Sequence, residues 1–152
     1  MTAPASAPPS ASVLRLDADA LNAFLASAFP HGGGGGLAQV VEAEPRRVRL
    51  VRAYDPMSLR PGGVISGPTL MGVAYTAAYA LVLAHIGIVP IAVTTSLTMH
   101  FLRPCKPGPL TAEAALLRLG RRIATCDIRL WTEGPDRIAA HATVAYAIPP
   151  GI

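Results

Sequence analysis

Residues 66–101 have the sequence SGPTLMGVAYTAAYALVLAHIGIVPIAVTTSLTMHF, which contains no lysine, arginine, aspartate or glutamate. Its first half is apolar on every side of a helix, and a helix of that kind is buried. Ser66 suits the N-cap, and Pro68 suits the first turn, where its missing N–H costs nothing. Gly87 is suited to end the helix. We therefore expect one long buried helix over about 67–86.

After Pro90 the spacing of the apolar residues changes to two, which is typical of a strand with one apolar face. The residues expected on that face are Ile91, Val93, Thr95, Leu97, Met99 and Phe101. Three further alternating runs follow at residues 110–119, 123–131 and 138–148, and turn signals join them. We expect the four runs to form an antiparallel meander.

The N-terminal part of the chain predicts a tail, a short helix and a hairpin. Residues 1–12 are rich in alanine, proline and serine, which favours a disordered tail. A helical pattern over 17–29 is followed by the glycine run 32–36, which we interpret as a flexible hinge. Residues 37–54 contain two strand-like runs on either side of a Glu-Pro turn. Residues 13–152 are therefore expected to form a single domain.

Composition excludes several classes of protein. Of the 152 residues, 51% are hydrophobic and 14% are charged, which is too apolar for a disordered chain. The net charge of +4 comes from scattered arginines, and aromatic residues are 5% of the chain, so a nucleic-acid surface is not expected. Cys105 and Cys126 have neither metal-ligand spacing nor the density of a disulfide scaffold. We expect no bound metal.

The charge-free segment also raises the possibility of a membrane span. Residues 68–90 are long enough to cross a bilayer. The polar side chains within this segment and the strand-like pattern that follows it argue against a span. The first fifteen residues lack the basic start and apolar core of a secretory signal. We therefore expect a cytoplasmic protein that is not inserted in a membrane.

The order of predicted elements is a helix, two strands, a long helix and four strands. A single antiparallel sheet wrapped around one central helix satisfies this order, so the predicted fold class is α+β. The second face of such a sheet is polar and one of its edges is open. Oligomerisation would cover both.

Three stretches carry a resemblance to a known family: GGVISGPT at 62–69, TSLTMHFLRP at 95–104, and Gly-Arg-Arg at 120–122. With the long helix, they resemble the hotdog-fold thioesterases of the phenylacetate-degradation (PaaI-like) type, over residues 37–148. The resemblance implies an acyl-CoA substrate, no cofactor apart from the coenzyme A of that substrate, and a homodimer or homotetramer. It also implies a thioester site between the helix start of one protomer and its neighbour.

This chain departs from the family at two positions. The family has His-Gly-Gly at the helix start, where this chain has Ser66, Gly67 and Pro68. The family carries a catalytic carboxylate further along the helix, where this chain has Tyr75. There is no carboxylate between Asp55 and Glu113. The resemblance therefore retains the backbone N–H that stabilises an oxyanion and lacks the base.

Four residues are candidates for the reaction. The N–H of Gly67 is suited to bind an oxyanion, or it forms an ordinary turn. Ser66 is a candidate nucleophile or an N-cap, and Asp55 is a candidate base or the cap of its own turn. The phenol of Tyr75 is suited to position a substrate or water, although its usual pKa makes it a poor base at neutral pH. The alternative for Tyr75 is packing.

Four arginines are candidates for binding the phosphates of coenzyme A, because a guanidinium group binds phosphate through paired hydrogen bonds. They are Arg103, Arg118, Arg121 and Arg122. The alternative is that they are solvated turn charges. His85 and His100 are expected to be structural.

Three functions remain open from the sequence. The first is hydrolysis of acyl-CoA thioesters. The second is a non-catalytic protein that binds acyl-CoA or a small ligand, which the tyrosine at position 75 favours. The third is a structural protein without a ligand, which leaves the arginine turn unexplained.

Overall fold

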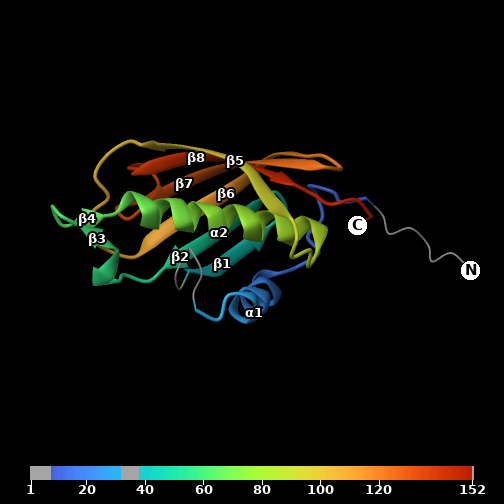
Figure 1. Cartoon of the computed structure of the whole chain (residues 1–152), viewed down its shortest axis with the longest axis horizontal. Helices are drawn as coiled ribbons and strands as arrows, with labels where there is room; N and C mark the ends of the chain where they lie inside the picture. Colours follow the sequence, from blue (N-terminus) through green and yellow to red (C-terminus); the bar gives the residue numbers. More distant parts are fainter. Residues whose placement is uncertain (1–7, 32–37, 152) are drawn as a thin grey trace, which may run out of the picture.

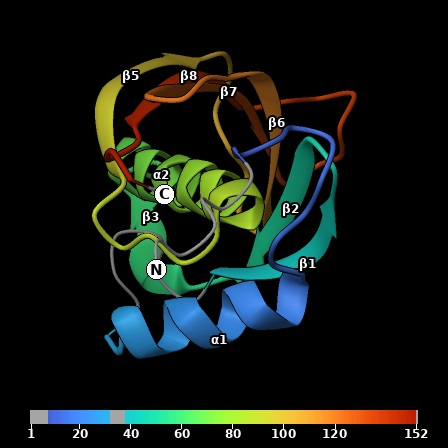
Figure 2. The ribbon, with the colours of Figure 1, turned by 90° about the vertical axis from the view of Figure 1, so that its right-hand side faces the viewer.

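The computed structural model describes residues 8–31 and 38–151. Its elements are α1 (Ala18–Ala28), β1 (Ala38–Glu44), β2 (Arg47–Arg52), a 3-10 turn η1 (Pro56–Ser58), β3 (Leu59–Arg60), β4 (Val64–Ile65), α2 (Gly67–Ile86), β5 (Val93–Phe101), β6 (Leu110–Leu119), β7 (Ile123–Trp131) and β8 (Ala140–Ala147). Six strands form one antiparallel sheet in the order β1-β2-β6-β7-β8-β5, and β3 pairs with β4. The sheet curls around α2, and α1 lies outside β1 (Figures 1 and 2).

The ends of α2 form as their residue types predict. The hydroxyl of Ser66 accepts a hydrogen bond from the N–H of Thr69 at 3.3 Å, which makes Ser66 the N-cap. At the other end Gly87 adopts a φ of 91°, and its N–H donates to the carbonyl of Leu83. A positive φ costs glycine little, so the helix ends there.

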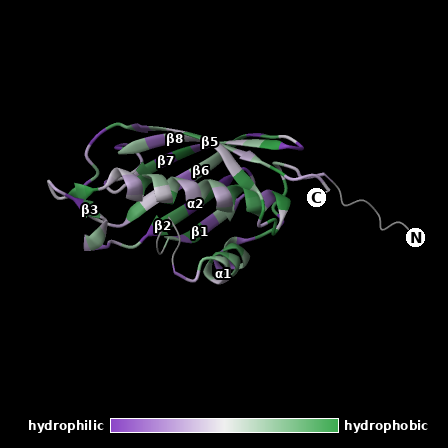
Figure 3. Ribbon diagram, in the orientation of Figure 1, coloured by the Kyte–Doolittle hydropathy of each residue, from purple (hydrophilic) through white to green (hydrophobic). Residues whose placement is uncertain are grey.

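The apolar composition of α2 results from burial in the protein core. By length and composition alone the helix could cross a membrane, but 67% of its most apolar 18-residue stretch is buried inside the fold. Figure 3 shows α2 in pale and green shades beside strands whose hydropathy alternates. The curled sheet therefore supplies the apolar surroundings that this helix requires.

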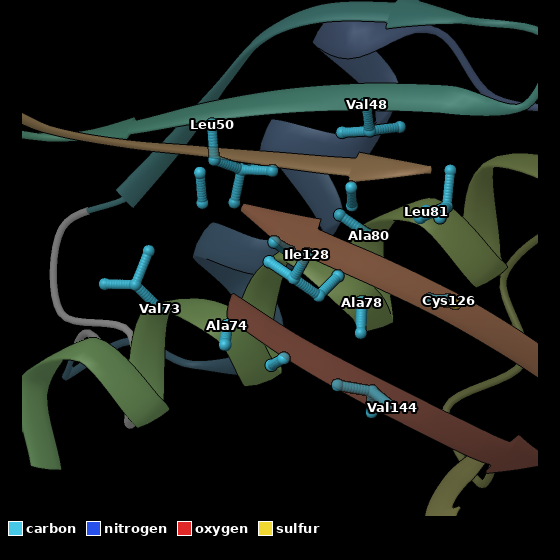
Figure 4. Packing of buried hydrophobic residues seen from close by; sticks show 14 of the residues in the cluster. Val48, Leu50, Val73, Ala74, Ala78, Ala80, Leu81, Cys126, Ile128 and Val144 are labelled. Carbon is cyan, nitrogen blue, oxygen red and sulfur yellow. The ribbon is translucent and has the colours of Figure 1, made fainter. Parts of the chain in front are cut away.

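The core lies between the inner face of the sheet and α2. Val48 and Leu50 of β2 and Ile128 of β7 are fully buried and contribute to it. Figure 4 shows these side chains packed with small residues of the helix, among them Ala74 and Ala78. Alanines on the helix leave room for the larger strand side chains, so the two layers pack closely.

The predicted meander is partly wrong. Strands β6, β7 and β8 pair in sequence order, but β5 pairs with β8 at the far edge of the sheet and not with β6. The connection between β5 and β6, residues 102–109, contains three prolines and spans the two strands, β7 and β8, that lie between β5 and β6 in the sheet. Between β2 and α2 the structure contains η1, β3 and β4.

The apolar face predicted for β5 is also partly wrong. The register shifts between Thr94 and Ser96, so that Val93 is opposite Ala147 and Leu97 is opposite Val144. Residues paired across an antiparallel sheet share a face. Ala147 and Val144 are three residues apart on β8 and therefore lie on opposite faces, so Val93 and Leu97 do too. A bulge inverts the alternation at this point, and no periodicity argument anticipates it.

Helix α1 is attached to the free edge of β1. Asp17 caps it by accepting a hydrogen bond from the N–H of Ala20 at 2.9 Å. The amide of Asn22 donates to the carbonyl of Val40 and accepts from the N–H of Val40, both at 2.8 Å. These bonds cover the edge of β1, so β5 is the edge strand that remains open in the described sheet.

The predicted tail and hinge lie only partly within the described residues. Residues 1–7 of the tail and the whole hinge at 32–36 lie outside them. In the described part of the segment, the N–H of Val13 donates to the carbonyl of Ser10, and Ala11 packs against the core. Leu14, just after the predicted tail, also packs against the core.

The outer face of the sheet is polar, as expected. Arg47 and Arg49 both bind the carboxylate of Glu113, at 3.1 Å and 2.7 Å, and Arg47 also binds Glu42. These partly exposed ion pairs join side chains of three neighbouring strands, β1, β2 and β6. They keep this face hydrated rather than contributing to the core.

Candidate active site along the exposed ridge of α2

One ridge of α2 is not covered by the sheet. Gly67, Met71, Tyr75 and Tyr79 are spaced four residues apart, so they lie along one side of the helix. Met71 is 40% exposed and Tyr75 is 45% exposed, whereas most of the helix is buried. The ridge is about 18 Å long at 1.5 Å per residue. It is the side of α2 that a ligand can reach.

The first turn of α2 presents a free hydrogen-bond donor. Within residues 8–31 and 38–151, the N–H of Gly67 has no hydrogen-bond partner. It lies at the positive end of the helix dipole, which favours an anion. A Cβ added to Gly67 would be 3.5 Å from the ring of Phe101, so this ring packs beside the donor. The geometry fits the predicted oxyanion site.

The hydroxyl of Ser66 is committed to capping. In addition to the bond from Thr69 N–H, its Oγ is 2.9 Å from the Thr69 hydroxyl. No histidine or carboxylate bonds to Ser66 among the residues that the structure describes. Without a neighbouring base the hydroxyl is a weak nucleophile, so the structure favours the capping role.

Asp55 lies near the helix start but its carboxylate faces its own turn. One oxygen accepts a hydrogen bond from Met57 N–H at 2.9 Å, and the other is 3.7 Å from the guanidinium of Arg52. The backbone connects this turn to the helix, because Ser66 N–H donates to the carbonyl of Ser58. Asp55 thus supports the helix start without pointing along the ridge, as its capping alternative predicted.

A cavity of about 750 Å³ opens along the middle of the ridge. Its walls come from α1, α2, the starts of β1 and β5 and the end of β8. The lining residues are Asn22, Leu25, Ala26, Phe29, Pro30, Ala38, Gln39, Met71, Gly72, Tyr75, Thr76, Tyr79, Pro90, Ala92, Val93, Thr94 and Tyr146. None of these described lining residues carries a charge, so the cavity suits an uncharged group.

Tyr79 is the centre of an aromatic cluster beside this cavity. Its ring stacks on Tyr146 with centroids 6.1 Å apart, meets the edge of Phe29 at 6.1 Å and lies 6.2 Å from Phe24. Its hydroxyl donates to the carbonyl of Pro90 at 3.1 Å. Burial raises the pKa of Tyr79, and burial is also the main cause that raises the pKa of Tyr146 to about 12. Both phenols therefore stay protonated at neutral pH and cannot act as bases.

Comparison with known proteins identifies the family of this chain. Residues 62–139, which include the helix start, the ridge and β5, match the thioesterase superfamily. The chain belongs to the thioesterase superfamily. Its fold is the hotdog fold of the PaaI-like type, as the resemblance implied.

Individual relatives of this thioesterase-superfamily protein support the assignment. A protein of Silicibacter sp. TM1040 described as a thioesterase is 36% identical, with a TM-score of 0.82 over 93% of this chain and 97% of that chain. A Ralstonia eutropha protein described as a phenylacetic acid degradation-related thioesterase is 26% identical, with a TM-score of 0.67 over 81% of this chain and 89% of that chain. A protein of Saccharolobus solfataricus assigned as an esterase is 29% identical over 101 residues, which are 66% of this chain and 65% of that protein's length.

The four candidate arginines of this thioesterase-superfamily protein do not form one site. Arg103 follows β5 at the end of the sheet where α2 begins, and its N–H bonds to the carbonyl of Ala139. Arg118 lies near the end of β6, and Arg121 and Arg122 lie in the turn that follows it, at the other end of the sheet. Arg121 and Arg122 line a separate hollow of about 290 Å³. The nine residues of β5 separate the two groups by about 30 Å, so one protomer cannot use both on one diphosphate.

The histidines that we expected to be structural lie away from the cavity of the thioesterase-superfamily fold. His85 is fully buried at the end of α2, and His100 lies on the outer face opposite His141, which bonds to Asp127. In the described part of the chain, no group of three histidine, cysteine, aspartate or glutamate side chains could hold a metal ion.

Sequence reasoning did not find the cavity. Of its aromatic residues, only Tyr75 was a predicted site residue. The spacing of Tyr75 and Tyr79 places both on one helix ridge and could have indicated Tyr79. Phe29 and Tyr146 reach the cavity only through the packing of α1 and the pairing of β5 with β8. No local signal identifies them.

Proposed function

We propose that this protein hydrolyses acyl-CoA thioesters at the start of α2. The observation that carries the proposal is the free N–H of Gly67 at the head of an exposed ridge that leads into an uncharged cavity. A thioester carbonyl placed there would accept this N–H as its oxygen becomes negative. Water would attack the carbonyl carbon, the carbon–sulfur bond would break, and the products would be a carboxylic acid and coenzyme A thiol.

In this arrangement the acyl group lies in the cavity. Pantetheine contains two amide groups, which need polar partners, and several polar side chains of the cavity wall are bonded to the backbone already. Thr76 donates to Gly72, Tyr79 donates to Pro90, and Asn22 is bonded to Val40. An apolar acyl chain has no polar groups, so it loses no hydrogen bonds when it is buried against such a wall. Coenzyme A then extends toward Arg103, and the turn at Arg118, Arg121 and Arg122 would serve only the opposite orientation.

A second function, binding of acyl-CoA or a small ligand without turnover, is favoured by Tyr75. This residue lies on the ridge between the free N–H and the aromatic cluster, and no carboxylate lines the cavity among the described residues. A phenol can hold a water molecule by a hydrogen bond but does not remove its proton at neutral pH. Turnover by the native chain is therefore expected to be slow or limited to few substrates.

We also propose that the protein is a homodimer or homotetramer. The exposed ridge of α2 and the open edge of β5 are apolar or hydrogen-bonding surfaces that a second copy would cover. Sedimentation at micromolar concentration tests this. A monomer would contradict it.

The two functions are separated by measuring turnover and binding together. A thiol-release assay with short, aromatic and long acyl-CoA esters is run beside calorimetric binding of the same esters. Release of thiol supports the hydrolase. Binding without release supports the non-catalytic function, and absence of both overturns the acyl-CoA proposal.

A further inference from the structure

Helix α1 forms one wall of the cavity and is fixed in place. Leu21 and Leu25 on the inner side of α1 are buried, and the side chain of Asn22 bonds to both the N–H and the carbonyl of Val40. Two hydrogen bonds to one residue of an edge strand define the position of the helix more strictly than apolar packing alone. The cavity therefore has a defined size on this side.

Phe29 is the large side chain at the end of that wall. It follows the last residue of α1, and its N–H donates to the carbonyl of Leu25 at 2.9 Å, which fixes its backbone. Its ring meets Tyr79 edge-on, at an interplanar angle of 81°, and lines the cavity. The ring is nevertheless 45% exposed, so it contributes less to the core than to the shape of the cavity.

The described lining of the cavity is also uncharged. Its described lining contains no arginine, lysine or histidine to pair with an anion, and the phenols of Tyr79 and Tyr146 donate to backbone carbonyls. A carboxylate at the end of an acyl chain would lose its hydration there without a charged partner.

We propose that Phe29, held against Tyr79, sets the largest acyl group that the cavity accepts, and that the cavity selects uncharged acyl groups. This proposal rests on the proposed function, because it assigns the cavity to the acyl part of the substrate. Removing the ring opens the cavity beyond Tyr79, so longer chains gain apolar contacts that the native wall denies them.

The test compares the native protein with Phe29→Ala and with the control Leu117→Ala, which removes an exposed apolar side chain of β6 that does not line the cavity. Each protein is assayed by kcat/KM over straight-chain acyl-CoA esters from butanoyl to hexadecanoyl. We expect Phe29→Ala to shift the preferred length upward by at least two carbons, with a gain of about tenfold for the longest esters. The control is expected to keep the native profile. An unchanged profile in Phe29→Ala overturns the proposal.

Charge selection is tested with a matched pair of substrates, hexanoyl-CoA and adipoyl-CoA, which differ by a terminal carboxylate. We expect the native protein to discriminate against adipoyl-CoA by at least about a hundredfold in kcat/KM or in binding constant. Equal use of the two esters overturns this part of the proposal.

A thermal-shift series with straight-chain alcohols, from butanol to dodecanol, examines the cavity independently of thioester chemistry. If Phe29→Ala moves the alcohol of greatest effect to longer chains while no acyl-CoA is bound or hydrolysed, the cavity assignment to an uncharged chain stands and the proposed function fails. If esters are hydrolysed but neither series shifts, the proposed function stands and the role of Phe29 is overturned.

Discussion

The imidazole of His85 joins the end of α2 to the backbone of Arg46 in the turn between β1 and β2. Nε2 accepts the N–H of Arg46 at 3.0 Å, and Nδ1 donates to the carbonyl of Leu81 at 2.9 Å. Arg46 has a φ of 70°, a conformation that costs a residue with a side chain some energy. The histidine therefore holds a strained turn against the central helix, and it does so only as a neutral ring.

This bond predicts a loss of stability in mild acid. Burial, the largest cause, holds the pKa of His85 below its usual value of 6.5, and the nearby Arg46 charge lowers it further. In the unfolded chain His85 binds a proton near pH 6.5, whereas in the folded chain it binds one only at lower pH. The free energy of unfolding therefore falls as the pH decreases below 6.5. Denaturant unfolding between pH 5 and pH 7.5 measures this fall. His85→Gln is expected to flatten it, whereas His100→Gln on the outer face is expected to keep it.

Replacing Gly67 tests the oxyanion donor directly. Gly67→Pro removes the N–H at a first-turn position that accepts proline, while Gly67→Ala keeps the N–H and places its Cβ at an ordinary 3.5 Å from Phe101. We expect Gly67→Pro to lower kcat by about a hundredfold or more with little change in binding, and Gly67→Ala to remain within a few-fold of native. Equal activity in the two variants, measured by thiol release, would remove Gly67 from the mechanism.

Tyr75 is the position at which a carboxylate should restore a base. Because its side chain is half exposed on the ridge, substitution is expected to leave the fold intact. We expect Tyr75→Asp to raise kcat by at least about tenfold over the native chain, since a positioned base contributes rate that a neutral phenol does not. Tyr75→Asn, of nearly the same size without the charge, is the control. If the two variants behave alike, the missing carboxylate is not what limits turnover.

The two arginine groups predict opposite orientations of coenzyme A. With the acyl group in the cavity, Arg103→Ala is expected to raise KM about tenfold and to weaken the dependence of KM on salt. The double variant Arg121→Ala, Arg122→Ala is then expected to leave KM near its native value. Steady-state kinetics at two salt concentrations measures both effects. If KM rises in the double variant and not in Arg103→Ala, coenzyme A binds in the opposite orientation.

The packing of the central helix predicts a large loss of stability on truncation. Leu81 is fully buried between α2 and the sheet, so Leu81→Ala should lower the free energy of unfolding by about 2–5 kcal/mol. Leu117→Ala, on an exposed side chain, should change it by less than about 0.5 kcal/mol. Chemical denaturation of both variants at one pH provides the comparison.

The central helix and the class of fold follow from local properties of the sequence. A charge-free run that begins with Ser66 and ends at Gly87 has one favourable state, because its caps and its apolar surface all require a buried helix. The alternation of β6, β7 and β8 likewise separates core from solvent without knowledge of their partners. Gly67 could be singled out for the same reason, since an unpaired N–H is a property of every helix start.

Only the tertiary structure decided what lies around that helix. The pairing of β5 with β8 and the bulge that inverts Val93 depend on contacts between segments far apart in the chain. The same contacts bring Phe29, Tyr79 and Tyr146 to one cavity and separate Arg103 from Arg122 by the length of a strand. Periodicity shows which face of a helix or strand is apolar. Which strand pairs with which depends on the paths of the connecting loops and on how side chains fit together in the folded chain.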